Sequence, residues 1–279
     1  MSLHSALKYL DMAKSSYCHN PKPRSESKRV TPLDERLEAA LKQLRSYELT
    51  LGYDKMTDYL RNKHGVIWNH KKVYRHMDRL HLLQPRRIKQ KWLKNKRLPA
   101  MCVLGVNQRW EMDITFVPTG TGALALFAII DTYDKAIVGD AMDIRATAMQ
   151  AVACLKCAVL ERFGVSSAEG LTLVVRVDRG CQFTAEEFRN AARGMGVNVE
   201  YCGVQAPNDK PYIESFFGCY KNEEVYRNDY ANYFEAYQGW NSYKAWYENL
   251  RPHGALENLS PKQFQNQENL NNKISPKTT

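Results

Sequence analysis

The sequence predicts an α/β protein with a mixed sheet, preceded by a small all-α domain. Apolar residues at helical spacing dominate residues 31–84, whereas short apolar strands and longer helical segments follow from residue 107. The charge changes near the same place, because residues 1–100 contain 23 Lys and Arg against 9 Asp and Glu, and residues 101–279 contain 17 against 21. This division predicts a polyanion-binding module joined to a second domain; a solubilising basic surface is the alternative.

The composition is that of a folded protein, with 44% hydrophobic and 25% charged residues in a chain of 279. The sequence contains neither an apolar segment long enough to span a membrane nor a secretory signal at its N-terminus. Its seven cysteines are an odd number and are scattered, so we expect reduced thiols in a cytoplasmic protein.

Residues 1–30 are predicted to form an N-terminal helix and a Pro-rich linker, and residues 31–84 three helices. The first helix is predicted to begin with Thr31 as N-cap and to end near residue 47. The second is predicted to end at Gly65, and the third to begin after Asn69 as N-cap.

The third of these helices is basic. Its apolar face contains Val73, Met77 and Leu80, and its basic residues off that face include Lys71, Lys72 and Arg75. Two short helices, a turn containing Gly and a basic third helix predict a helix-turn-helix-like, DNA-binding domain; a protein-binding helical adapter is the alternative.

Residues 85–106 are predicted to be a basic linker. Between residues 86 and 98 there are seven basic side chains and no acidic one, beginning with Arg86 and Arg87. Such a segment is expected to follow a phosphate backbone without reading base sequence.

Residues 107–230 are predicted to form the α/β core, and residues 231–279 a C-terminal helix and a tail that is disordered after Asn266. Three successive strands that form an antiparallel meander are followed by a helix, a strand, a helix, a strand and helices. The predicted ranges, in the same order, are 108–116, 123–130, 135–142, 146–163, 171–177, 185–195, 197–202, 211–226 and 232–250. This is the element order of a ribonuclease H-like core.

Three carboxylates are the candidate catalytic residues. Asp113 lies on the first strand, Asp178 ends the fourth, and Glu214 lies in the first turn of the helix after residue 210. In a mixed sheet whose first strand lies beside the fourth, the two aspartates approach each other. Because three such carboxylates repel one another without a cation, they predict a site for Mg²⁺, with Mn²⁺ as a substitute. Two bound ions would suit phosphoryl transfer.

Two further acidic residues compete for this site. Asp131 ends the second strand, but we expect it to stabilise the following turn. Glu111 shares the face of Asp113 and is expected at the edge of the site. Gly180 is expected to supply either a special backbone conformation or a close approach that a side chain would block.

Two lysines near Glu214 are predicted to contact DNA. Lys210 precedes the helix, and Lys221 follows Glu214 by seven residues, which is two helical turns. Lys221 therefore shares the face of Glu214, from which it can reach a phosphate near the metal ions. The interval from Asp178 to Glu214 leaves 35 residues between them.

With these motifs in this order, residues 30–265 resemble the integrase-core (D,D-35-E) transposases of bacterial insertion sequences, of the second-reading-frame type related to retroviral integrases. The motifs are Trp110-x-x-Asp113-Ile-Thr115, Ala128-Ile-Ile-Asp131, Asp178-Arg-Gly-x-Gln-Phe183, Asn208-x5-Glu214-Ser-Phe-Phe217, Lys221-x-Glu223, Tyr247-Glu-Asn-Leu-Arg251-Pro-His253 and Ser260-Pro-x-x-Phe264. Val177, where relatives often have Ser, and the partly matching segment 207–213 depart from the pattern and leave the target preference open.

The resemblance implies metal-dependent hydrolysis at the ends of an element, followed by attack of the freed 3′-OH on target DNA. It also implies double-stranded DNA as partner, a homo-oligomer that holds two DNA ends, a first-frame helix-turn-helix partner protein and a place at the bacterial nucleoid. Two alternatives are a ribonuclease H-like nuclease without strand transfer and an inactive DNA-binding regulator. The three carboxylates offer no support for the regulator.

Overall fold

The computed structural model divides the chain into two compact units, residues 1–39 and residues 40–279. In the first unit, Leu7 is helical and the helix α3 (Glu35–Lys42) begins. The structure describes Leu7, Ser167, Gly170 and residues 34–84, 103–165, 172–203 and 210–274.

The helices before residue 85 begin and end at capping residues. Asp34 accepts a hydrogen bond from the Leu37 amide at 3.1 Å and so is the N-cap of α3, which corrects the predicted Thr31. Helix α3 also ends at Lys42, before the predicted end near residue 47, and a 3₁₀ turn η1 (Glu48–Thr50) follows.

Helices α4 (Tyr53–His64) and α5 (His70–Arg79) agree with the prediction. Gly65 has the left-handed conformation, with φ of 66°, that ends many helices, and Asn69 accepts a hydrogen bond from the Lys71 amide at 2.9 Å. Val73 and Met77 are fully buried on one face of α5.

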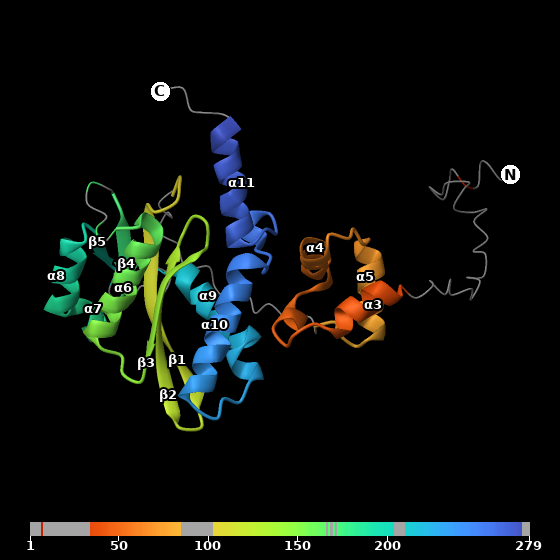
Figure 1. Cartoon of the computed structure of the whole chain (residues 1–279), viewed down its shortest axis with the longest axis horizontal. Coiled ribbons are helices and arrows are strands. Elements are labelled where there is room, and N and C mark those ends of the chain that lie inside the picture. The colour runs from red at the N-terminus through yellow and green to blue at the C-terminus, as the bar shows by residue number, and fades with distance from the viewer. Residues whose placement is uncertain are drawn as a thin grey trace. The chain divides into compact units, whose positions relative to one another are not determined.

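The sheet has five strands in the order β3-β2-β1-β4-β5 (Figure 1). Strands β1 to β3 are antiparallel neighbours, whereas β4 pairs in parallel with both β1 and β5. The predicted meander, and the position of the first strand beside the fourth, are therefore confirmed. The strands are β1 (Arg109–Thr119), β2 (Gly122–Asp131), β3 (Ile137–Asp143), β4 (Val174–Val177) and β5 (Asn198–Tyr201).

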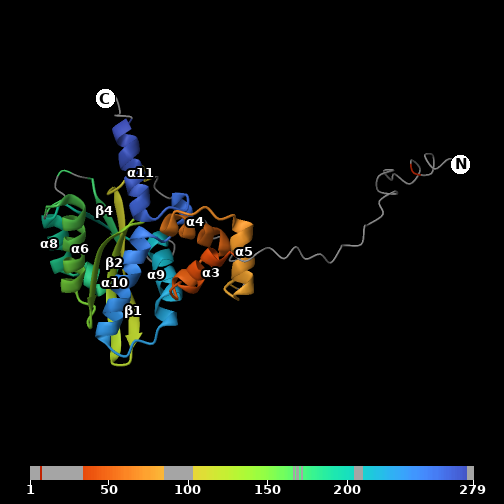
Figure 2. The same ribbon diagram turned by 45° about the vertical axis from the view of Figure 1, so that its right-hand side comes forward.

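Helices cover both faces of this sheet, as Figures 1 and 2 show. One face carries α6 (Ala148–Phe163), α7 (Cys181–Thr184) and α8 (Glu186–Gly194), and the other carries α9 (Pro211–Glu223) and α10 (Tyr233–Asn249). Because both faces are covered, β2 is buried almost throughout, which explains its continuous apolar sequence. None of the helices in the described ranges is long and apolar enough to cross a membrane.

The hydrophobic core on the first of these faces is formed by Trp110 and Met112 of β1, Val175 of β4, and residues of the covering helices such as Leu155 and Phe188. All five side chains are fully buried. Burial of this apolar surface contributes roughly 25 cal/mol per Å² and fixes β1 and β4 side by side. Phe116, four residues after Met112 on the same face of β1, is 56% exposed.

Three further features differ from the sequence prediction. Helix α7, which was not predicted, follows Gly180 directly. The helix predicted over residues 211–226 ends at Glu223 and is followed by a separate 3₁₀ turn η2 (Val225–Arg227). The prediction of disorder after Asn266 was wrong as far as Ile274, because α11 (Pro261–Ile274) continues to that residue. Ser260 and Gln263 cap α11 reciprocally: the Ser260 hydroxyl accepts from the Gln263 amide at 3.3 Å, and the Gln263 side chain accepts from the Ser260 amide at 2.9 Å.

A buried ion pair joins the end of α9 to the segment after α10. Arg251 donates two hydrogen bonds to Glu223, from Nε at 2.8 Å and from Nη2 at 2.6 Å, and the Tyr243 hydroxyl donates a third at 2.9 Å. Such a planar, bidentate contact fixes both direction and distance. Two sequence motifs, one around Lys221 and the other around Arg251, are thus held together by charge.

We expect Glu248→Gln to remove a pH dependence of stability. Glu248 accepts a hydrogen bond from the Ile137 amide at 2.6 Å, and burial raises the pKa of its carboxyl to about 7. Because this pKa lies above that in the unfolded chain, the folded state binds more protons, and the free energy of unfolding falls by about 3 kcal/mol as pH rises from 4.5 to above 7. Urea unfolding across this range should show a shallower fall in the variant. Glu161→Gln, exposed on α6, is the control, and an equally shallow fall there would contradict the assignment.

Candidate active site

The pairing of β1 with β4 brings Asp113 and Asp178 to one lysine. Lys210 Nζ lies 2.9 Å from Asp113 Oδ1 and 3.5 Å from Asp178 Oδ2. The side chain of Lys210 is 7% exposed, against 20% for Asp113 and 44% for Asp178. A buried ammonium therefore lies between two partly exposed carboxylates.

This ammonium is held by charge. Although Nζ is within ion-pair distance of both aspartates, it makes no hydrogen bond of normal geometry with any group in the described part of the chain. Lys210 was predicted to contact DNA, and the ion pairs show that it can also neutralise the two aspartates.

Asp178 is oriented by the glycine that follows it. The Gly180 amide donates a hydrogen bond to Asp178 Oδ1 at 2.7 Å, which leaves Oδ2 facing Lys210. A Cβ at Gly180 would lie 2.9 Å from Asp178 Oδ1 and would also collide with the side-chain amide of Gln182. The φ angle of Gly180 is −57°, so the glycine is required for space and not for a left-handed backbone. The predicted close approach is confirmed.

Glu214 lies in the first turn of α9 with an exposed side chain. Burial of its carboxyl raises its pKa, the charge of Asp113 raises it further, and Lys210 opposes both. Glu214 is thus within electrostatic range of Asp113 and Lys210. The described ranges nevertheless contain no group of three His, Cys, Asp or Glu side chains placed to hold a metal ion. The structure brings Asp113 and Asp178 to one cation and leaves Glu214 at the side.

Glu111 holds the N-terminus of α9. Its Oε2 accepts hydrogen bonds from the Tyr212 and Ile213 amides, both at 2.9 Å. These amides belong to the first turn of α9, whose N-cap residue Lys210 makes no capping hydrogen bond with its side chain. Burial raises the pKa of Glu111, and the two amides oppose this effect. The alternation of β1 places Glu111 on the face of Asp113, but nothing in the sequence indicates that it caps a helix 100 residues later.

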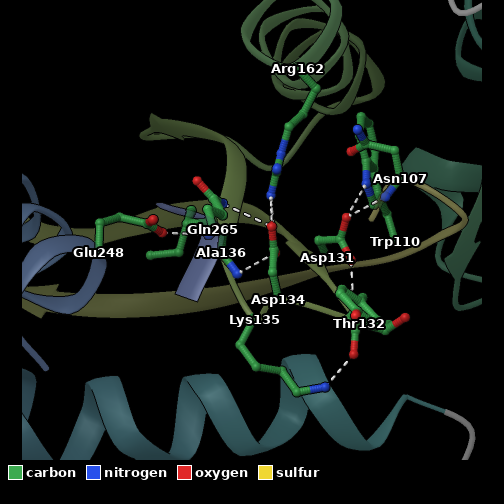
Figure 3. A network of polar contacts seen from close by, with 12 residues as sticks. Asn107, Trp110, Asp131, Thr132, Asp134, Lys135, Ala136, Arg162, Glu248 and Gln265 are labelled. Atoms are coloured by element: carbon green, nitrogen blue, oxygen red, sulfur yellow. Dashed lines mark hydrogen bonds and ion pairs between the residues drawn. The ribbon is translucent and has the colours of Figure 1, made fainter. Parts of the chain in front are cut away.

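Asp131 lies outside this site, in the polar network that Figure 3 shows. It accepts hydrogen bonds from the Asn107 and Tyr133 amides, at 2.7 and 2.8 Å, and from the Trp110 indole at 3.3 Å. Nearby, Asp134 forms an ion pair with Arg162 at 2.9 Å. These contacts agree with the expectation that Asp131 stabilises the turn.

The remaining predicted DNA contacts lie on two helices. Lys221 lies partly exposed on α9, a continuous helix from Pro211 to Glu223, so it shares a face with Glu214. On α5, Lys71 and Arg75 are exposed and Lys72 is half-buried. Arg86 and Arg87 lie outside the described residues.

Three family models match the chain. A model described as an HTH-like domain matches residues 32–91, and two described as integrase core domains match residues 104–207 and 195–261. Together they span the helices before residue 85 and the sheet with its covering helices.

Curated relatives come from bacterial insertion elements. An uncharacterized 39.2 kDa protein of insertion element IS476 from Xanthomonas euvesicatoria is 25% identical over 95% of this chain and 72% of its own length. Transposase InsF for insertion sequence IS3fB from Escherichia coli is 30% identical over 58% of this chain and 55% of its own length. The chain thus spans about half the length of that transposase.

Among solved structures, the catalytic core domain of HTLV-2 integrase, determined in complex with magnesium, is similar to this chain. The TM-score is 0.44 and the sequences are 16% identical. The match covers 58% of this chain and 97% of the integrase domain.

We expect Glu111→Gln to loosen the start of α9. Glutamine keeps the shape but replaces an ionised acceptor by a neutral one, so the two hydrogen bonds weaken, and the free energy of unfolding should fall by about 1–3 kcal/mol. Hydrogen exchange should then be faster at the Tyr212 and Ile213 amides than elsewhere in α9. Glu187→Gln, exposed on α8, is the matched control. Unchanged exchange at these two amides would contradict the role of Glu111.

Proposed function

The chain belongs to the integrase-core transposases of insertion sequences of the IS3 type, whose function is DNA transposition, and from that premise we propose the steps that it catalyses. It cuts DNA at the ends of an insertion sequence and joins the freed 3′ end to target DNA. One observation carries the proposal: two carboxylates from neighbouring parallel strands share a single cation.

The oxygen donors of the site suit a hard divalent cation. Asp113, Asp178 and Glu214 would hold Mg²⁺, or Mn²⁺ in its place, and two ions would fit a three-carboxylate site. When bound, the ions activate the attacking oxygen and stabilise the leaving oxygen of the phosphodiester. The ammonium of Lys210 supports this assignment, because it shows that positive charge is stabilised between the two aspartates.

In this proposal Lys210 has two roles. Without metal ions, it neutralises Asp113 and Asp178. Because its contacts depend on charge and not on directed hydrogen bonds, a divalent cation can replace it at the carboxylates. The released ammonium then contacts a DNA phosphate beside the site, together with Lys221 from the same side of α9.

The other partners follow from the family. Lys71, Lys72 and Arg75 of α5, with Arg86 and Arg87, would contact the terminal inverted repeats through DNA phosphates. Two DNA ends must meet, so we propose a homo-oligomer on DNA, with a first-frame helix-turn-helix protein as a further partner. The place of action would be the bacterial nucleoid, in the cytoplasm.

A strand-transfer assay with paired element ends and Mg²⁺ tests the proposed reaction. Joined products support the transposase steps. Cutting without joining would instead indicate a nuclease, and retention on DNA without chemistry would indicate a regulator.

In that assay, we expect Asp178→Asn to lower both cutting and joining by about 10²- to 10³-fold, because the neutral amide removes a negative metal ligand. DNA retention in a gel-shift assay should stay within about twofold of the native chain, since Asp178 contributes no attraction for phosphate. Asp229→Asn, at an exposed position, serves as the matched control and should be fully active. Normal joining by the Asp178 variant would refute the metal-site assignment.

We expect Lys210→Gln to tighten metal binding. Removing the competing ammonium should raise the affinity for Mn²⁺ about tenfold, as measured by the paramagnetic signal of free Mn²⁺. In metal-free buffer with a chelator, the unscreened aspartates should lower the free energy of unfolding by about 1 kcal/mol. Lys221→Gln is the matched control, because no carboxylate of the described ranges forms an ion pair with Lys221. Equal Mn²⁺ affinity in the native chain and both variants would exclude competition by Lys210.

A further inference from the structure

A cavity of about 400 Å³ lies against the side of α9 that faces away from Glu214. We call it the α9 cavity. Five α9 residues line it, and Tyr212, Ser215 and Cys219 recur at the spacing of one helical face. The lining residues from α9 are Pro211, Tyr212, Ser215, Phe216 and Cys219. The cavity is therefore separate from the carboxylate site, although one helix borders both.

Three cations line the α9 cavity, and its described lining contains no Asp or Glu. Arg251 is neutralised by Glu223, which does not line the cavity. Lys135 donates a hydrogen bond to the Thr132 carbonyl, and its ammonium lies 3.7 Å from the centre of the Tyr212 ring. Neither contact supplies a full negative charge. The third cation is Lys55 of α4, for which the described ranges contain no ion-pair partner within 4.0 Å.

His253 adds an unpartnered nitrogen to the wall. The residue is 8% exposed, and its buried Nε2 has no hydrogen-bond partner in the described part of the chain. Its Nδ1 lies 3.5 Å from Arg251 Nη1, and since a guanidinium can only donate, Nδ1 is the acceptor of that contact. With that tautomer the hydrogen of the neutral ring is on Nε2, where a ligand oxygen would give this buried donor an acceptor.

The pKa shifts of the residues that line the cavity also favour an anionic ligand. Burial, acting with the charges of Arg251 and Lys55 and against a backbone hydrogen bond with Tyr247, lowers the pKa of His253 to about 2, so the ring stays neutral. Burial also lowers the pKa of both Lys55 and Lys135. Carboxylates behind the wall oppose this effect, Glu223 at Lys55 and Asp131, Glu111 and Asp134 at Lys135. None of them lines the cavity, so an anionic ligand would bring the negative charge into it.

We propose that the α9 cavity binds a phosphate group, whose oxygens accept hydrogen bonds from Lys55, Lys135 and His253 Nε2. Donors from three separate segments of the chain suit a tetrahedral oxyanion better than a planar carboxylate, which needs a fork of two donors. The group is either a phosphodiester of bound DNA or free phosphate. Neither source requires the metal-dependent reaction, so the site stands apart from the proposed catalysis.

Binding of inorganic phosphate to the full chain, measured calorimetrically at constant ionic strength, tests the proposal. We expect saturable binding that weakens at least tenfold in Lys55→Gln and in Lys135→Gln. Lys156→Gln, which removes the same charge from the exposed side of α6, should bind within twofold of the native chain. The nitrogen resonance of His253 Nε2 should shift when phosphate is added to the native chain. This measurement tests the contact without relying on the folding of any variant.

A duplex DNA without phosphate in the buffer distinguishes the two sources. If the ligand is a phosphodiester, DNA displaces inorganic phosphate, and the salt dependence of DNA binding falls by about one unit of slope in both lysine variants but not in Lys156→Gln. If the ligand is free phosphate, DNA leaves phosphate binding unchanged. The proposal is overturned if neither phosphate binding nor the salt dependence of DNA binding distinguishes the two lysine variants from Lys156→Gln.

Discussion

Two like charges on neighbouring parallel strands need a cation between them, and this need governs the site. The β1–β4 pairing places Asp113 and Asp178 together because the apolar side chains beneath, such as Trp110 and Val175, are fully buried and leave no freedom of register. The packing of the core therefore holds the carboxylates of Asp113 and Asp178 close enough to repel each other, and a positive charge is needed to offset that repulsion. Lys210 lies within ion-pair distance of both aspartates and neutralises this repulsion.

Helix α9 is held in place at both of its ends. Glu111 holds its first turn through two backbone amides, and the ion pair of Glu223 with Arg251 holds its last residue. With both ends fixed by carboxylates from β1 and from α9 itself, the helix has one defined rotation about its axis. That rotation brings Glu214 within electrostatic range of Asp113 and places Tyr212 in the wall of the α9 cavity. A single helix thus separates two sites of opposite charge.

The fold was predictable because strand and helix periods differ and because the order of elements allows few topologies. The proximity of the two aspartates was predictable as well, since the element order of a ribonuclease H-like core places β1 beside β4. Contacts between distant segments were not. The capping of α9 by Glu111 joins residues about 100 positions apart, and the ion pair of Lys210 depends on the path of a loop, so neither leaves a periodic signal. The tail after Asn266 was misjudged because its polar composition hides the capping box of α11.

The double role proposed for Lys210 would also couple metal binding to DNA binding. If a divalent cation releases the ammonium from Asp113 and Asp178, the released charge becomes available to a phosphate, and DNA binds more tightly when the metal is present. By thermodynamic linkage the reverse must hold to the same extent: DNA that draws Lys210 away from the aspartates exposes two repelling carboxylates and so tightens the binding of the metal. A chain with this arrangement assembles its charged site chiefly when both ligands are present. Under this proposal a metal-loaded site without DNA would be disfavoured, because the ammonium of Lys210 would then compete with the metal for the two aspartates.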